Sequence, residues 1–149
     1  MSLSDLDKAI ELIEEYGGGD FEGGKDQAII EKAENVLEVE FPPTYLKFLS
    51  TLGAGDIEGL EFYGVINEDF ENSGIPDAVW LTLNERKHGL PKHLIIIYSA
   101  GDGTYYAIDT SQINSHGESP IVSVDTMGKI NKISDDFGSF LLSELQTVL

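Results

Sequence analysis

The apolar residues of this chain change their spacing once along the sequence, and this change constrains the fold. Up to residue 53 they recur every three to four positions, which predicts helices at 4–16, 29–38 and 43–52. Beyond that point, short apolar runs bounded by Gly, Asp and Asn predict strands at 60–65, 94–98, 104–109 and 121–124. A short helix is expected at 77–87 and a closing helix after Ser134. This order of elements favours an α+β fold over alternating βαβ units.

Individual residues mark where these elements begin and end. Ser4 is expected to cap the first helix and Ser134 the last. Asp102-Gly103 is a strong signal for a β-hairpin. The glycine-rich, acidic stretch 17–24 predicts a flexible connector, and residues 53–59 predict a helix stop followed by a turn.

The charge of the chain limits the partners it can have. Among 149 residues, 9 Lys and Arg stand against 27 Asp and Glu, a formal net charge of -18. Such a surface repels phosphate, so free nucleic acid and anionic membranes are poor partners, and the one small basic cluster is Arg86-Lys87 with Lys92. The charge favours a basic protein partner, with plain solubilisation as the alternative.

Several classes of site are excluded by the residues that the chain lacks. It has no cysteine, which excludes disulfides, zinc-thiolate sites and a cysteine nucleophile. Its longest apolar run, 94–98, is far shorter than the roughly 20 residues of a membrane-spanning helix. The N-terminus lacks a basic-then-apolar secretion signal, so we expect a cytoplasmic protein.

Motifs that suggest catalysis or nucleotide binding are incomplete. Residues 19–25 match the first part of a phosphate-binding P-loop, but Asp26 stands where a Ser or Thr hydroxyl should hold magnesium, and a helix precedes the loop. Ser99 lies in half of a nucleophile elbow whose leading glycine is missing. Glu85 and His88 form a single Glu-x-x-His pair, where dinuclear sites need two. We therefore expect no catalytic residues, metal or cofactor.

After the second predicted helix, the segment from Phe41 to Leu49 reads Phe-Pro-Pro-Thr-Tyr-Leu-Lys-Phe-Leu and is followed by Leu-Gly-Ala-Gly at 52–55. These two motifs resemble the signature of the SUKH superfamily, the Smi/Knr family. Weaker pieces follow in the order of the family pattern, at 61–64, 103–110, 119–122 and 137–141. The stretch 17–24 does not match the pattern and is interpreted as a variable insertion.

The resemblance implies a single Smi/Knr-like domain over 1–149, with a central, mostly antiparallel sheet flanked by helices. Bacterial members of the superfamily are commonly immunity proteins that bind and neutralise the toxic domain of a secreted polymorphic toxin, often a nuclease. The fungal branch is associated with regulation of cell-wall synthesis and with signalling scaffolds. The hypothesis is therefore a cytoplasmic immunity protein that binds a basic toxin domain, with a non-catalytic scaffold as the alternative.

Under this hypothesis the interface is expected to consist of acids in the strand-rich half of the chain. These are Asp56, Glu58, Glu61, Glu68, Asp69 and Asp102. Tyr63 and Trp80, if exposed, are the aromatic anchor candidates, because binding energy concentrates in such residues. Acids on the first two helices, such as Glu14, Glu15, Glu31 and Glu34, carry the same charge and remain alternatives.

Overall fold

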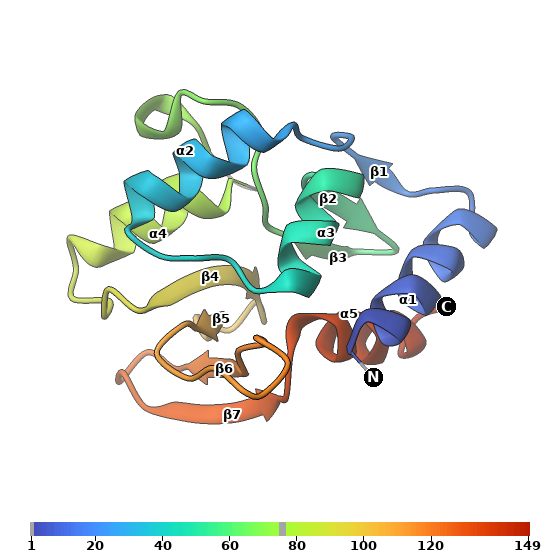
Figure 1. Ribbon diagram of the computed structural model, residues 1–149. Helices are drawn as coiled ribbons and strands as arrows, with labels where there is room; N and C mark the ends of the chain where they lie inside the picture. The colour runs from blue at the N-terminus through green and yellow to red at the C-terminus, as the bar shows by residue number, and fades with distance from the viewer. Residues whose placement is uncertain (1, 75–76) are drawn as a thin grey trace.

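The computed structural model of the protein describes residues 2–74 and 77–149 and has the expected α+β fold (Figure 1). Along the chain its elements are α1 (Ser2–Glu15), β1 (Asp20–Phe21), α2 (Gln27–Leu37), α3 (Pro43–Thr51), β2 (Gly55–Ile57), β3 (Leu60–Phe62), the short 3-10 helix η1 (Phe70–Asn72), α4 (Ala78–Arg86), β4 (Leu94–Ser99), β5 (Tyr105–Asp109), β6 (Ile121–Val124), β7 (Ile130–Ser134) and α5 (Phe137–Gln146).

The strands form two antiparallel sheets rather than one, in the orders β1-β2-β3 and β4-β5-β6-β7. The backbone N–H of Tyr63, just after β3, donates to the carbonyl of Ile97 on β4 at 2.9 Å and so joins the two sheets. Helix α1 packs mainly against α5, which brings the two ends of the chain together (Figure 1). Helix α5 also contacts the larger sheet directly, because the ring of Phe140 packs edge-on against Tyr98 of β4 and Tyr106 of β5.

An aromatic cluster between α3 and α5 forms the centre of the core. Tyr45, Phe48 and Phe137 are all fully or almost fully buried, and their ring centroids lie 5.0 to 5.9 Å apart. The spacing of the apolar residues on α3, predicted from the sequence, points Tyr45 and Phe48 to the same side of the helix. The Tyr45 hydroxyl donates to the carbonyl of Tyr63 at 2.9 Å, so the core also holds the end of β3.

Two of the expected helix caps are wrong. Ser4 lies inside α1, which begins at Ser2, and Ser134 is the last residue of β7. The cap of α5 is Asp136, whose carboxylate accepts a hydrogen bond from the Ser139 N–H at 2.8 Å. Strand β7 was not expected because its sequence is mostly exposed and lacks alternation between apolar and polar residues.

The stretch 17–24 is not a free connector, which corrects the sequence interpretation. Its residues Asp20 and Phe21 form β1 and pair with β2, which lies in the segment expected to be only a turn. The N–H of Glu22 donates to the carbonyl of Ala54 at 2.8 Å, and that of Gly23 donates to Leu52 at 3.0 Å. The sequence hid this strand because pairing with a partner more than thirty residues away stabilises it.

Candidate partner-binding surface

Three acidic side chains lie in one row across the β1-β2-β3 sheet. In the observed register Asp20 is opposite Asp56, and Asp56 is opposite Glu61. Directly opposite residues of antiparallel strands point to the same face and have neighbouring Cβ atoms. The fold thus gathers three carboxylates from separate parts of the sequence, although like charges in this position repel one another.

The electrostatics of this row reflect that crowding. Burial raises the pKa of Glu61, and the neighbouring carboxylate of Asp56 raises it further. Within residues 2–74 and 77–149 no salt bridge reaches Asp20, Asp56 or Glu61. A cation from a partner would therefore relieve repulsion that the protein itself does not offset.

Glu58 adds a fourth acid at the tip of the β2-β3 hairpin. Ile57 pairs with Leu60, so the turn consists of Glu58 and Gly59, both with positive φ (49° and 81°). Two such residues are typical of the tight hairpin turn whose twist matches that of the strands. Glu58 is exposed there. We call the surface formed by Asp20, Asp56, Glu58 and Glu61 the acidic hairpin face.

The structure brings together three of the six expected interface acids, Asp56, Glu58 and Glu61. Asp20 belongs with them and was missed, because the sequence interpretation treated its surroundings as a connector. The neighbouring Phe21 was the available signal: its ring packs edge-on against Phe48, with centroids 6.5 Å apart, as an apolar residue in a free connector would not.

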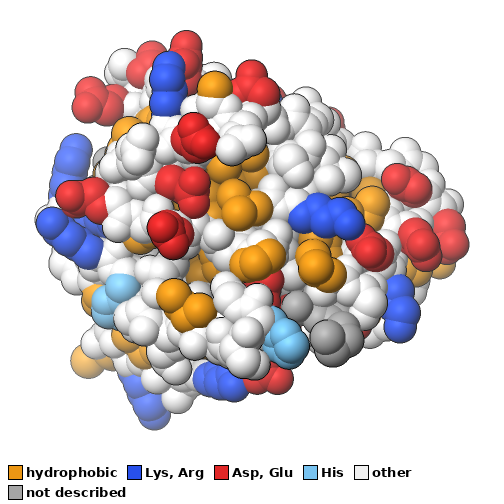
Figure 2. Space-filling view, in the orientation of Figure 1, with side chains coloured by type: hydrophobic (Ala, Val, Ile, Leu, Met, Phe, Trp, Pro, Cys, Tyr) orange, Lys and Arg blue, Asp and Glu red, His pale blue; other side chains and the backbone are white. Residues whose placement is uncertain are grey.

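The other three expected acids lie elsewhere in the fold. Glu68 pairs with Lys32 of α2, and Asp69 precedes η1, where its carboxylate accepts a hydrogen bond from the Asn72 amide at 3.1 Å. Asp102 lies in the β4-β5 turn, where its bond from the Thr104 N–H lowers its pKa. Acidic side chains are spread over the face shown in Figure 2, so charge alone does not define one surface.

The two aromatic anchor candidates are core residues to different degrees. Tyr63 is 4% exposed, so the expectation that it could serve as an exposed anchor is wrong. Its backbone links β3 to β4, and this position turns its ring into the cluster with Ala78, Leu81 and Ile96. Trp80 is half-buried and packs against the same cluster. The acidic hairpin face therefore has no exposed aromatic anchor among these two residues.

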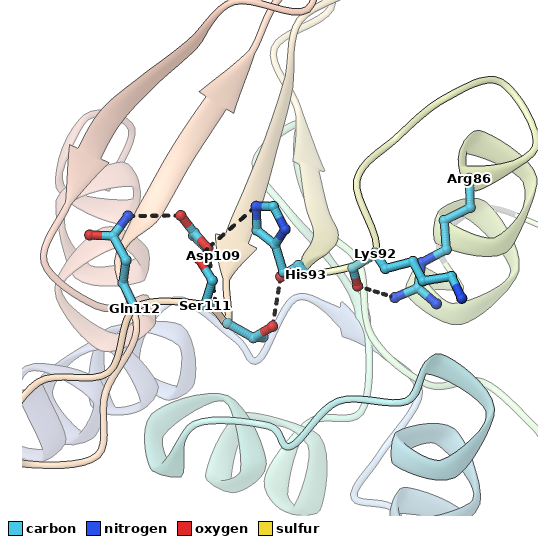
Figure 3. A network of polar contacts seen from close by, with 7 residues as sticks. Arg86, Lys92, His93, Asp109, Ser111 and Gln112 are labelled. Atoms are coloured by element: carbon cyan, nitrogen blue, oxygen red, sulfur yellow. Dashed lines mark hydrogen bonds and ion pairs between the residues drawn. The ribbon is translucent and has the colours of Figure 1, made fainter.

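A polar network around His93 tests whether the chain contains catalytic geometry (Figure 3). The Nε2 atom of His93 lies 3.8 Å from the Asp109 carboxylate. The Asp109 carboxylate also accepts hydrogen bonds from the Ser111 hydroxyl at 2.5 Å and from the Gln112 amide at 2.8 Å. Burial raises the pKa of Asp109, but these two hydrogen bonds and the nearby His93 outweigh it, so that the pKa of Asp109 is lowered. Ser111 thus donates to the carboxylate and not to the imidazole, unlike the serine of a hydrolase triad.

The P-loop-like segment has its own structural role. The N–H groups of Glu22, Gly23 and Lys25 donate to carbonyls of Ala54, Leu52 and Leu49, so the loop's amides are used inside the protein. A phosphate-binding loop needs such amides free to surround the phosphate.

The described residues also contain no cluster of three or more His, Asp or Glu arranged to hold a metal ion. Among residues 2–74 and 77–149, no helix is long and apolar enough to span a membrane.

Comparison with protein families agrees with this architecture. Residues 6–146 match the model of the family SUKH_5, described as SMI1-KNR4 cell-wall. Five helices with two antiparallel sheets are consistent with that family. The chain belongs to the SMI1-KNR4 (SUKH) family.

Proposed function

We propose that this protein is an immunity protein that binds a basic toxin domain and neutralises it. The observation that carries the proposal is the row of Asp20, Asp56 and Glu61, which places three unpaired carboxylates side by side on one sheet. Nucleases present basic clefts to their substrates, and an acidic surface is steered toward such a cleft and can cover it. The net charge of -18 and membership of the family, whose bacterial members are commonly immunity proteins, support the same reading.

The role proposed here is binding without catalysis. The acidic hairpin face offers carboxylates on a tight hairpin, and no group there has to gain or lose a proton for binding. Inhibition would follow from occupying the toxin's substrate cleft, because a bound acidic surface excludes the phosphate backbone from it. We place this interaction in the cytoplasm of the producing cell, where the toxin would otherwise act.

The test is survival of a susceptible host that expresses the toxic domain of a secreted polymorphic toxin, chosen by its being encoded beside this gene. Co-expression of the wild-type chain is expected to rescue growth. The double variant Asp56→Lys/Glu58→Lys is expected to lose rescue. It is expected to stay folded, because Asp56→Lys puts a cation between the carboxylates of Asp20 and Glu61, and circular dichroism checks this. Glu11→Lys/Glu71→Lys makes the same charge change at exposed positions on α1 and η1 and is expected to keep rescue.

These variants separate the function from the surface. Failure of the well-expressed wild-type protein to rescue would contradict the immunity role. If Asp56→Lys/Glu58→Lys still rescued growth, the immunity role would stand, but the acidic hairpin face would not be the surface that binds the toxin.

A second candidate is a non-catalytic regulatory scaffold, which the cell-wall description of the matched family favours. A scaffold would retain one stable partner when purified from its own cells and would give no protection against a toxin. The rescue experiment therefore discriminates between the two functions.

A further inference from the structure

A groove lies between α2 and α3, and its floor is formed by Ile30, a residue of the buried core. It has a volume of about 510 Å³, and its apolar lining comes from Ile30, Pro43 and Leu46. Pro43 is exposed and Leu46 is half-exposed, so water reaches this lining. Figure 2 shows apolar side chains in the middle of this face of the molecule.

Apolar residues continue beyond the groove, and we call them, together with Pro43 and Leu46, the apolar strip. Pro42, next to Pro43, lines a neighbouring hollow of about 410 Å³ together with Val39 and Ile113. Ile113 is 69% exposed, among the most exposed large apolar side chains in the described part of the chain.

Acidic residues of α2 border the strip along one side. Glu31 and Glu34 lie three residues apart on α2, and Glu38, four residues further, is the residue that caps the C-terminal end of this helix. We call these three acids the acidic stripe of α2. Glu31 and Glu34 line the groove, and Glu38 lines the hollow together with Glu40. Figure 2 shows acidic side chains beside the apolar ones in this region.

The lysines near the strip already have acidic neighbours. Lys47 pairs with Asp7 at 2.6 Å, and Lys25 lies 3.8 Å from Glu22. Lys92 lies 3.7 Å from Glu38, but both side chains are more than 70% exposed, so solvent screens the pair. The α2 border therefore keeps an excess of negative charge.

We propose that this groove binds an amphipathic, basic helix of a partner protein. Its apolar side would cover Pro43, Leu46 and Ile113, and its Lys or Arg side chains would lie along the acidic stripe of α2. A helix fits because its apolar residues form a line beside which charged residues recur at the same spacing. The identification of the partner as a toxin rests on the proposed function. The amphipathic and basic character of the bound helix is inferred from the groove alone.

The probe is a fluorescein-labelled helical peptide of about four turns, built from Leu and Lys so that the leucines share one side. A scrambled peptide of the same composition has no apolar side. Fluorescence anisotropy with the full-length protein is expected to show the amphipathic peptide binding at least about tenfold more tightly than the scrambled one. Leu46→Gln, which keeps a good helix former in α3, is expected to weaken binding at least about fivefold.

Charge variants test the acidic stripe. Glu31→Lys/Glu38→Lys is expected to weaken binding of the amphipathic peptide about tenfold or more, whereas Glu11→Lys/Glu71→Lys, with the same change of net charge elsewhere, is expected to weaken it less than about threefold. Circular dichroism and thermal unfolding verify that each variant is folded. Equal losses in the two double variants would mean that bulk charge alone binds the peptide, and this would overturn the proposal.

Other outcomes are equally decisive. No measurable binding of the amphipathic peptide, or no effect of folded Leu46→Gln, would also overturn the groove proposal. If the groove variants still rescued growth and still bound the peptide as tightly as wild type, the groove would not be a binding site, but the immunity role would stand. Groove-dependent peptide binding without toxin rescue by the wild type would keep the groove and remove that role.

Discussion

The carboxylate of Glu118 accepts two hydrogen bonds from Thr44, one from its backbone N–H at 2.9 Å and one from its hydroxyl at 2.8 Å. Thr44 lies in the first turn of α3, where Pro42 provides no side-chain cap. Glu118, distant in sequence, satisfies an N–H that the helix itself leaves unpaired. The Thr44 hydroxyl oxygen in turn accepts from the Gly138 N–H at 3.2 Å, so one buried contact holds the starts of α3 and α5.

Replacing Glu118 should therefore destabilise the protein. Glu118→Ala leaves the N–H and hydroxyl of Thr44 buried without this acceptor, a loss expected to cost about 1–3 kcal/mol of unfolding free energy. Urea unfolding followed by circular dichroism measures it. Glu71→Ala, at an exposed position on η1, is expected to change stability by less than about 0.5 kcal/mol. Equal midpoints for the two variants would contradict the capping role of Glu118.

Glu61 should make stability depend on pH. Because the pKa of Glu61 is raised in the folded protein, its contribution is fully present below the usual glutamic acid pKa and is lost as the pH rises through the raised value. Glu61→Gln removes this titration, so the variant should gain stability relative to wild type as the pH increases from about 4 to 7. Urea unfolding at several pH values tests this, and a constant difference would contradict it.

Asp135 provides the opposite sign. Its bond and charge interaction with Lys132 lower the pKa of Asp135, so its contribution is present above the usual aspartic acid pKa and is lost as the pH falls through the lowered value. Asp135→Asn should therefore lose stability relative to wild type as the pH rises from about 2 to 4, the range below the usual aspartic acid pKa. The effect is expected to be small because both side chains are largely exposed. A shift in the same direction as that of Glu61→Gln would contradict this assignment.

Salt should affect binding of a basic toxin domain mainly through the association rate. If the acidic hairpin face steers the encounter, raising the salt concentration from about 50 to 500 mM should slow association far more than it speeds dissociation. Surface plasmon resonance with the purified toxic domain measures both rates. Asp56→Lys/Glu58→Lys should associate more slowly and with a weaker salt dependence. A binding constant that stays flat over this range would contradict steering.

The sequence predicted those features that depend on neighbouring residues. The helical spacing of Tyr45 and Phe48 predicted α3 and its buried side, and the hairpin signal at 102–103 predicted the β4-β5 turn. These signals are local because a helix or a tight turn is stabilised within a few residues. The order of elements, together with the family resemblance, was enough for the fold class.

The parts that were missed depend on distant partners. Strand β1 exists because β2 pairs with it, so no pattern within residues 17–24 could place Asp20 beside Asp56. The burial of Tyr63 follows from the hydrogen bond between its backbone and Ile97 on the other sheet. Net charge favours a basic partner, but only the strand register shows which acids share a face. Likewise, the groove beside Glu31 depends on how α2 and α3 pack.

The pairing of β1 should depend on Gly55. This residue has a φ of +153°, and a side-chain carbon there would collide with the carbonyl oxygen of Asp20. Gly55→Ala should therefore separate β1 from β2 and cost at least about 1 kcal/mol of unfolding free energy. The freed segment would no longer hold Asp20 beside Asp56, so affinity for a basic partner should also fall.

Hydrogen exchange gives the readout that is specific to this strand. The N–H groups of Glu22 and Gly23, which donate to Ala54 and Leu52, should exchange faster in Gly55→Ala than in wild type, while the amides of α5 stay protected. Gly74→Ala is the control, since its added carbon would meet no atom within 4 Å and its φ lies outside the positive region. If Gly55→Ala left exchange at Glu22 and Gly23 unchanged, the close approach of the two strands would not depend on the missing side chain.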